Sequence, residues 1–215
     1  MTTLHSESVD LVLTDPPYGI GINEMNFVTG GRVKHRGPVA FNSDFSQLDT
    51  SWDSSPITEE SISQIIRVSK NQIIFGGNFI ADKLRPSRCW VIWDKKGSDK
   101  YQNDFADCEL AWTSFDRPSR IIRYLWSGML QEDMSNKEKR FHPTQKPVAV
   151  VSKIIEWFSK TGDTILDPFL GSGTTAIACA KLNRNCIGVE INPEYVEIAK
   201  TRLNLIQEQM KLSEA

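Results

Sequence analysis

The last third of the chain alternates short apolar runs with amphipathic segments, and this alternation constrains the fold more than any other feature of the sequence. Apolar residues recur at helical spacing from Val148 to Phe158, and Gly162 is expected to end that helix. The pattern then predicts, in order, a strand at 164–166, a helix at 174–182, a strand at 186–189 and a long helix beginning at Asn192-Pro193. Strands that alternate with helices form mostly parallel sheets with helices on both faces. We therefore expect an α/β fold.

The first two thirds of the chain hold further strands, separated by two long irregular segments. The predicted elements are strands at 9–14, 72–75, 89–93, 108–112 and 120–126, a helix with Thr58 as its N-cap, and a short helix at 78–84. The last two strands flank Asp116-Arg117-Pro118 and are expected to pair as an antiparallel hairpin. Segments 19–56 and 127–146 lack periodicity and are predicted to be long loops. A chain of 215 residues suits a single domain, residues 1–215, that carries these two loops as insertions.

The composition excludes several classes of protein. No apolar run reaches the ~18 residues of a membrane-spanning helix, and the polar start lacks the apolar core of a secretion signal. The four cysteines are scattered without a CxxC pair, as in a reduced cytoplasmic protein. The net charge of -2 does not by itself indicate nucleic-acid binding, although a local basic patch can supply the contact. We therefore expect a cytoplasmic protein with no membrane partner.

A glycine-rich turn joins the strand at 164–166 to the helix at 174–182. Gly171 and Gly173 let the backbone approach a ligand closely, and the start of the helix offers free N–H groups. Glu190 follows the next strand, where a carboxylate can accept hydrogen bonds from both hydroxyls of a ribose. The unit can therefore hold an adenosine-containing cofactor, although an ordinary structural turn stays open. A dinucleotide site is disfavoured because GxGxxG is absent and Asp167 would repel a pyrophosphate, whereas it suits a cationic sulfonium or ammonium.

The tetrapeptide Asp15-Pro16-Pro17-Tyr18 directly follows the strand at 9–14. Its two prolines stiffen the backbone, which holds a carboxylate, a carbonyl and an aromatic ring in one small space. Alone, such a tetrapeptide is more often a structural proline turn. Together with the glycine loop downstream, it resembles the DNA amino-methyltransferases, in the motif order of their beta group. The resemblance covers roughly residues 8–205 and extends to Ile74-Phe75-Gly76-Gly77-Asn78, Trp90-Val91-Ile92-Trp93-Asp94-Lys95, His142-Pro143-Thr144-Gln145-Lys146-Pro147, Asp167-Pro168-Phe169, Gly171-Ser172-Gly173-Thr174-Thr175, Gly188, Glu190 and Tyr195.

The resemblance implies a Rossmann-like S-adenosylmethionine-dependent methyltransferase fold, with a mostly parallel sheet, an antiparallel hairpin and helices on both faces. It implies methyl transfer to an exocyclic amine of double-stranded DNA, preferably N6 of adenine, on a base flipped out of the duplex. The catalytic residues would be Asp15, Pro16, Pro17 and Tyr18. The Asp15 carboxylate and the Pro16 carbonyl would accept hydrogen bonds from the amine, and the Tyr18 ring would stack on the base. No metal is expected, because His142 has no second ligand at a suitable spacing.

The resemblance also implies a cofactor site and two DNA-contacting loops. Glu190 would hold the ribose of S-adenosylmethionine, and Lys146 would lie near the carboxylate of its methionine end. The full cofactor set is Thr144, Gln145, Lys146, Asp167, Pro168, Phe169, Gly171, Ser172, Gly173, Thr174, Glu190 and Asn192. Basic residues of the loops are expected to position DNA phosphates: Arg32, Lys34 and Arg36 in the first loop, and Lys139 and Arg140 in the second. No separate recognition domain is evident, so recognition is expected to be small or shared across a homodimer.

Three alternatives stay open at this point. A cytosine-N4 methyltransferase has nearly the same chemistry, although Ser is more usual there than Asp15. A catalytically weak DNA-binding module would keep the fold, whereas a methyltransferase of RNA or protein glutamine is disfavoured because Asn-Pro-Pro-Tyr is absent and the motif order differs. Members of the family usually carry a short strand and a Gly-Asp segment before the equivalent of Ser8. Only seven residues precede Ser8 here, so either a truncated start or a minimal enzyme with a trimmed sheet edge is expected.

Overall fold

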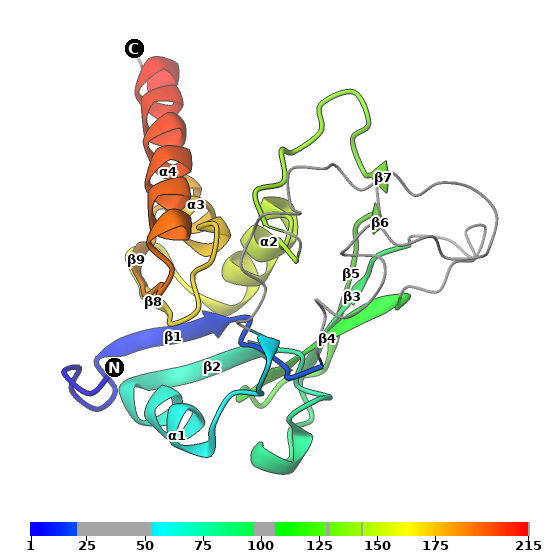
Figure 1. Ribbon diagram of the computed structural model, residues 1–215, viewed down its shortest axis with the longest axis vertical. Helices are drawn as coiled ribbons and strands as arrows, with labels where there is room; N and C mark the ends of the chain where they lie inside the picture. Colours follow the sequence, from blue (N-terminus) through cyan, green and yellow to red (C-terminus); the bar gives the residue numbers. More distant parts are fainter. Residues whose placement is uncertain (21–52, 97–105, 128–129, 143, 215) are drawn as a thin grey trace.

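A computed structural model describes residues 1–20, 53–96, 106–127, 130–142 and 144–214. Within these residues seven strands form one sheet in the order β5-β3-β4-β2-β1-β8-β9, and two short strands pair separately (Figure 1). The strands are β1 (Val9–Thr14), β2 (Ser69–Phe75), β3 (Trp90–Asp94), β4 (Cys108–Thr113), β5 (Arg120–Arg123), β6 (Trp126–Ser127), β7 (Leu130–Gln131), β8 (Thr164–Asp167) and β9 (Asn185–Gly188). The helices are α1 (Glu59–Val68), the 3-10 turn η3 (Ala81–Lys83), α2 (Val148–Phe158), α3 (Thr174–Lys181) and α4 (Pro193–Glu214).

The centre of the sheet brings the two predicted motifs together. β1 pairs in parallel with β2 on one side and with β8 on the other, with Leu11 opposite Ile165 and Val12 opposite Leu166. Parallel neighbours end at the same edge of a sheet, and ligands of open α/β sheets bind outside these carboxyl ends. The turn after β1 and the glycine loop after β8 therefore lie side by side, although most of the chain separates them in sequence.

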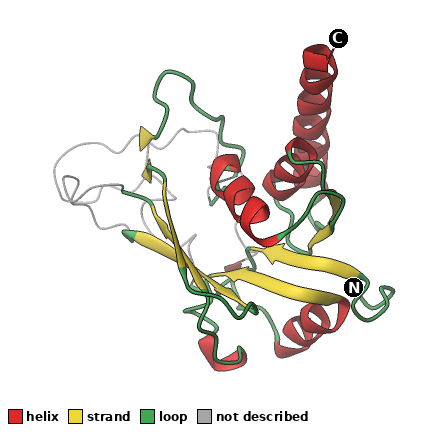
Figure 2. Ribbon diagram, turned by 180° about the vertical axis from the view of Figure 1, so that it is seen from behind, coloured by secondary structure: helices red, strands yellow, loops and turns green. Residues whose placement is uncertain are grey.

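Helices cover both faces of the sheet, as predicted (Figure 2). On one face α2 and α3 bury Ile154, Ile155 and Ala178 against Leu11 and Leu13 of β1. On the other face α1 buries its apolar residues against a second cluster that includes Val12. Successive strand residues point to opposite faces, so the apolar residues of β1 serve both clusters. The strand is buried on both sides, which fixes its register and the position of the turn that follows it.

The predicted hairpin between the strands at 108–112 and 120–126 is wrong. β5 instead pairs in parallel with β3, and β4 lies between β3 and β2, antiparallel to both. The connection between β4 and β5 is held against the end of α2. The Phe115 ring packs on Phe158 with centroids 4.8 Å apart, and Arg117 donates to the Trp157 carbonyl at 2.8 Å. These contacts carry the chain across β3 to its far edge, which a local turn signal does not reveal.

Several element boundaries also differ from the predictions. α2 ends at Phe158 rather than at Gly162, because the backbone turns extended at Ser159 (φ -142°, ψ 168°), whose hydroxyl donates to the Ile155 carbonyl. The short helix expected at 78–84 shrinks to the single turn η3. Thr58 caps α1 as predicted and accepts a hydrogen bond from the Ser61 N–H at 3.2 Å. The loop predicted at 127–146 contains the small β6–β7 ribbon.

Among the described residues, no helix combines the length and the apolar character that a membrane span needs.

Candidate active site

The Asp15–Tyr18 turn is anchored at the carboxyl edge of the sheet. The backbone N–H groups of Tyr18 and Gly19 both donate to one carboxylate oxygen of Asp53, each at 2.9 Å. Asp53 is buried and belongs to the segment that leads into α1. The turn is therefore held by a buried carboxylate as well as by its own prolines, which keeps its side chains in fixed positions.

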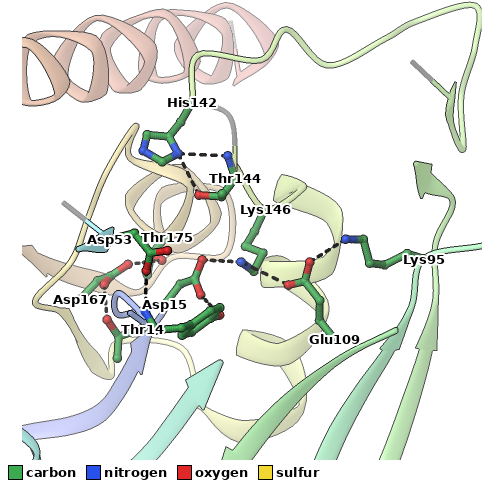
Figure 3. Close-up of polar contacts among 11 residues, drawn as sticks. Thr14, Asp15, Asp53, Lys95, Glu109, His142, Thr144, Lys146, Asp167 and Thr175 are labelled. Atoms are coloured by element: carbon green, nitrogen blue, oxygen red, sulfur yellow. Dashed lines mark hydrogen bonds and ion pairs between the residues drawn. The ribbon is translucent and has the colours of Figure 1, made fainter. Parts of the chain in front are cut away.

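The Asp15 carboxylate uses both of its oxygens within the protein. The Tyr18 hydroxyl donates to one oxygen, and the Lys146 ammonium pairs with the other (Figure 3). Burial raises the pKa of Asp15 above its ordinary value, the positive charge of Lys146 opposes that rise, and the negative charge of Glu109 adds to it. Asp15 is thus a desolvated carboxylate that already accepts hydrogen bonds from an N–H and an O–H donor. Such a group can equally accept one from an amine.

Lys146 lies between two carboxylates. Its ammonium pairs with Asp15 and lies 3.2 Å from one oxygen of Glu109, while the other oxygen of Glu109 accepts from Lys95 at 2.8 Å. Burial alone would lower the pKa of Lys146, but the two carboxylates raise it above its ordinary value. The cation is therefore permanently charged and held beside the catalytic turn. Its contact with the methionine end of a cofactor stays a prediction.

The sequence analysis named neither Glu109 nor Lys95 as a site residue, although Lys95 ends a segment that carries the resemblance. Burial alone would raise the pKa of Glu109, but Lys146 and Lys95 lower it below its ordinary value. Glu109 lies on β4, in a run that otherwise consists of strand-forming residues. A carboxylate inside such a run was the available signal, because a buried charge needs a partner. The identity of that partner depended on the sheet order and was not visible in the sequence.

Tyr18 packs against a glycine and a second aromatic ring. The Tyr18 and Phe79 rings are stacked with centroids 5.0 Å apart and an interplanar angle of 23°. A Cβ at Gly76 would overlap the Tyr18 ring, so the glycine makes room for it. Phe79 is half exposed and was not predicted as a site residue. The aromatic surface beside Asp15 is thus larger than one ring, which suits stacking with a planar base.

Asp167 is buried at the junction of the two motifs. Its carboxylate accepts hydrogen bonds from the Thr14 hydroxyl at 2.8 Å, the Thr175 hydroxyl at 2.6 Å and the Phe169 N–H at 3.1 Å. Burial raises the pKa of Asp167 to about 6, although all three hydrogen bonds oppose the rise. Asp167 therefore ties β1, β8 and α3 together. Its contact with a cofactor stays a prediction.

The glycine loop faces Glu190, as predicted. The Gly171 N–H donates to one oxygen of Glu190 at 2.8 Å, and the Asn192 N–H donates to the other at 2.8 Å. Each carboxylate oxygen has two acceptor sites, so Glu190 keeps capacity for two ribose hydroxyls. The space around the Cα of Gly171 is open, whereas Gly173 has φ 88° and packs on Ala199. The loop thus offers an open backbone beside an acidic group, which fits an adenosine-bearing cation.

The remaining predicted cofactor residues surround this loop. Pro168, Ser172 and Thr174 are buried, and Thr174 begins α3. The Asn192 side chain accepts from the Glu194 N–H at 2.9 Å and so caps α4. These positions support the loop, and direct contacts with a cofactor stay predictions.

A hydrogen-bond network joins the loop at 127–146 to the glycine loop. Gln145 accepts from the Ser172 hydroxyl at 3.2 Å and donates to Glu138 at 2.9 Å. Arg202 of α4 donates to the Ser172 carbonyl at 2.6 Å and pairs with Glu138 at 3.2 Å. Burial raises the pKa of Glu138, and Arg202 is among the groups that oppose the rise. Glu138, the neighbour of the predicted DNA contact Lys139, therefore points inward and fixes the loop that carries Lys146.

His142 is held by neighbours within the protein. The N–H and hydroxyl of Thr144 lie 3.2 and 3.0 Å from its Nδ1, and its ring packs on Tyr195 at 4.7 Å. Burial, with the charge of Lys146 adding to it, lowers the pKa of His142 to about 4. The ring is therefore neutral. In the part of the chain that the structure covers, no three His, Cys, Asp or Glu side chains gather as a metal site.

The predicted DNA contacts are only partly described. Arg32, Lys34 and Arg36 lie outside the described residues. Lys139 is exposed, with its ammonium over the Phe141 ring at 5.0 Å. Arg140 is half-buried over the Trp126 ring at 4.3 Å. Contacts of all five basic residues with DNA stay predictions.

A cavity of about 480 Å³ lies between α3, β9 and α4. Leu170, Gly188 and Glu190 line it on the side of the glycine loop, whereas Asp15 and Lys146 do not. The cavity therefore borders the candidate cofactor site but does not contain the catalytic turn.

The comparisons with known proteins agree with this geometry. A family model described as DNA methylase, of the N6 and N4 type, matches residues 63–201. The chain belongs to this DNA methylase family. Type II methyltransferase M.HpaI of Haemophilus parainfluenzae is 52% identical over 241 residues, which cover 95% of this chain and 71% of M.HpaI. Type II methyltransferase M2.LlaDCHI of Lactococcus lactis subsp. cremoris is 39% identical over 114 residues, 53% of this chain and 41% of that relative.

Solved structures show the same fold. M1.HpyAVI in complex with S-adenosylmethionine is 23% identical, with a TM-score of 0.53 over 92% of this chain and 90% of that one. The cytosine-N4-specific PvuII DNA methyltransferase is 15% identical, with a TM-score of 0.57 over 96% and 86%. The expected family and the Rossmann-like fold are thereby confirmed.

Proposed function

We propose that this DNA methylase transfers a methyl group from S-adenosylmethionine to N6 of an adenine flipped out of double-stranded DNA. The observation that supports this best is the Asp15 carboxylate, desolvated, beside the Tyr18 ring and next to the glycine loop of β8. The family contains methylases of the adenine-N6 and the cytosine-N4 amine. Asp rather than Ser at position 15 favours adenine.

The residues have separate tasks in this reaction. When bound, S-adenosylmethionine supplies a methyl group on a positively charged sulfur, and Glu190 and the open backbone at Gly171 are the groups that fit its ribose. The exocyclic amine of adenine is a poor nucleophile because its lone pair is delocalised into the ring. Asp15 and the Pro16 carbonyl accept hydrogen bonds from the amine, which localises the lone pair and stabilises the positive charge that develops on nitrogen. Asp15, whose pKa is raised, then accepts the proton that the nitrogen loses.

Tyr18 and the loops hold the DNA. The stacked pair of Tyr18 and Phe79 provides an aromatic wall for the extruded base, and each stacked base contributes about 1–3 kcal/mol to binding. We further propose that residues 1–215 form one catalytic domain, with DNA phosphates bound by loops 19–56 and 127–146. A cytoplasmic setting and a homodimer belong to the same proposal.

The test compares the wild type with Asp15→Ala. Each protein is incubated with unmethylated DNA and labelled S-adenosylmethionine, and the DNA is digested to nucleosides for mass spectrometry. N6-methyladenosine from the wild type alone is the expected result. Asp116→Ala is the matched control, because Asp116 is an exposed carboxylate paired with Arg88 outside the site.

Two outcomes would contradict the proposal. N4-methylcytosine as the product would assign the enzyme to the cytosine branch of the family. No modified base, from a folded protein that binds S-adenosylmethionine, would indicate a binding module without methyl transfer.

A further inference from the structure

Four charged side chains form an alternating row at the catalytic turn. Asp15, Lys146, Glu109 and Lys95 follow one another, and each ion contacts the next (Figure 3). The Lys146 side chain is only 9% exposed, whereas those of Asp15 and Glu109 are 26% and 25% exposed. The row has no net charge, and Lys146 is the cation that two carboxylates share.

The Asp15–Lys146 ion pair in this row competes with binding of the target amine. Asp15 must accept a hydrogen bond from the target amine, yet each of its oxygens already accepts one, from Lys146 or from Tyr18, and keeps only one further acceptor site. The Lys146 ammonium and an exocyclic amine are both N–H donors. Lys146 therefore competes with the target amine at Asp15, and its charge opposes the positive charge that develops on the amine nitrogen.

Lys146 can leave Asp15 only if its ammonium finds another carboxylate partner. A buried ion separated from its partner is strongly destabilising, whereas an ion that changes partners keeps its compensation. Glu109 supplies the second partner, because one of its oxygens already lies 3.2 Å from the Lys146 ammonium. Lys95 holds the other oxygen of Glu109 at 2.8 Å, which keeps Glu109 ionised and fixed in place.

We propose that Glu109 is a positioning residue that receives the Lys146 ammonium when the target amine displaces it from Asp15. The inference rests on the proposed function, since it assumes that an amine binds Asp15. The exchange swaps hydrogen-bond partners, makes and breaks no covalent bond, and moves no proton. It applies to an exocyclic amine of adenine or of cytosine alike.

The proposal has a signature in the pH dependence of the reaction. Asp15 must be ionised to accept the amine, so the acid limb of the rate profile reports its protonation. Within the described residues, the charged or titratable groups that face Asp15 and Lys146 from the surrounding elements are Tyr18, Glu109, His142 and Asp167, with Lys95 behind Glu109. The negative charge of Glu109 raises the pKa of Asp15. Replacing Glu109 by an uncharged residue therefore moves the acid limb to lower pH. It also leaves Lys146 with Asp15 as its sole carboxylate partner in this row.

The test measures kcat, KM for S-adenosylmethionine and the pH profile of Glu109→Gln and Glu109→Asp. For Glu109→Gln we expect kcat to fall at least about tenfold, an acid limb shifted to lower pH, and KM for S-adenosylmethionine within about twofold of the wild type. Glu109→Asp keeps the charge and should recover part of kcat with a nearly unshifted limb. Glu156→Gln, an exposed carboxylate of α2 paired with Lys153, is the matched control.

A double-mutant cycle tests whether Glu109 acts through Lys146. On the background of Lys146→Met, Glu109→Gln should cost much less in kcat than in the wild type, because the cation that it receives is gone. Equal losses on both backgrounds, or a fall in kcat with an unmoved acid limb, would overturn the proposal. If the wild type methylates DNA and Glu109→Gln is fully active, the role of Glu109 is refuted while the proposed function stands. A wild type that methylates no base would refute the proposed function and this role with it.

Discussion

Asp167→Asn should remove a pH-dependent loss of stability that the buried carboxylate imposes on the fold. The Asp167 carboxylate is 4% exposed, and burial raises its pKa from 3.8 to about 6. An asparagine keeps the shape of the side chain. Its amide oxygen can accept from Thr14 and the Phe169 N–H, and its amide nitrogen can donate to the Thr175 hydroxyl. The substitution therefore removes the charge while the hydrogen bonds persist.

The sign and size of the effect follow from linkage. The folded state holds the proton of Asp167 more tightly than the unfolded chain, so its contribution to stability is fully present below about pH 3.8 and is lost as the pH rises through about 6. The full loss is about 3 kcal/mol, of which about 2 kcal/mol falls between about pH 4.5 and about pH 7.5. Relative to the wild type, Asp167→Asn should therefore gain about 2 kcal/mol of stability across that interval.

Urea denaturation of both proteins at several pH values between these limits measures this difference. The comparison cancels the titration of the groups that do not interact with Asp167, and Asp116→Asn serves as the control for an exposed carboxylate. A stability difference between Asp167→Asn and the wild type that stays constant with pH would refute the reasoning. Calorimetric titration with S-adenosylmethionine adds a second readout. An unchanged affinity in Asp167→Asn would assign Asp167 to the scaffold and remove it from the predicted cofactor contacts.

Two further predictions concern the glycine loop and the cation beside Asp15. Gly173→Ala should lower the free energy of unfolding by about 2–4 kcal/mol, because φ is 88° and the new Cβ would lie 2.8 Å from the Cβ of Ala199. Gly162→Ala, with φ 87° and no atom within 4 Å of its Cβ, should cost only about 1–2 kcal/mol in the same urea assay, and equal losses would contradict the steric argument. Lys146→Met should move the acid limb of methylation to higher pH, because Lys146 lowers the pKa of Asp15. An unmoved limb in the pH profile of kcat would show that the ion pair does not form.

Local patterns in the sequence predicted the elements of this fold well. A short, mostly apolar run such as β1 is typical of a buried strand, and Thr58 caps α1 through a bond within one helical turn. The two motifs were equally visible, since each is a short strand followed by a turn whose residues restrict or free the backbone. The helix end at Phe158 was missed because Ser159 caps it before Gly162 is reached.

The order of the strands depended on contacts that no local signal carries. The turn at 116–118 is typical of a hairpin, but packing of Phe115 on Phe158 carries the chain across β3. The wrong prediction therefore concerned pairing, whereas the two strands themselves are present. Each pairing in a sheet is decided by the total apolar area that the finished layers bury, and that sum includes helices far along the chain.

The sequence by itself determined the chemical groups, because Asp15, Tyr18, the glycine loop and Glu190 are recognisable from their neighbours in the chain. Only the tertiary structure decided which of these groups meet. Lys146 pairs with Asp15 across 131 residues, and Thr14 bonds to Asp167 across 153 residues. The partner of a buried charge is set by the strand order and by the desolvation of the site, both of which arise only when the sheet and its two helical layers close together.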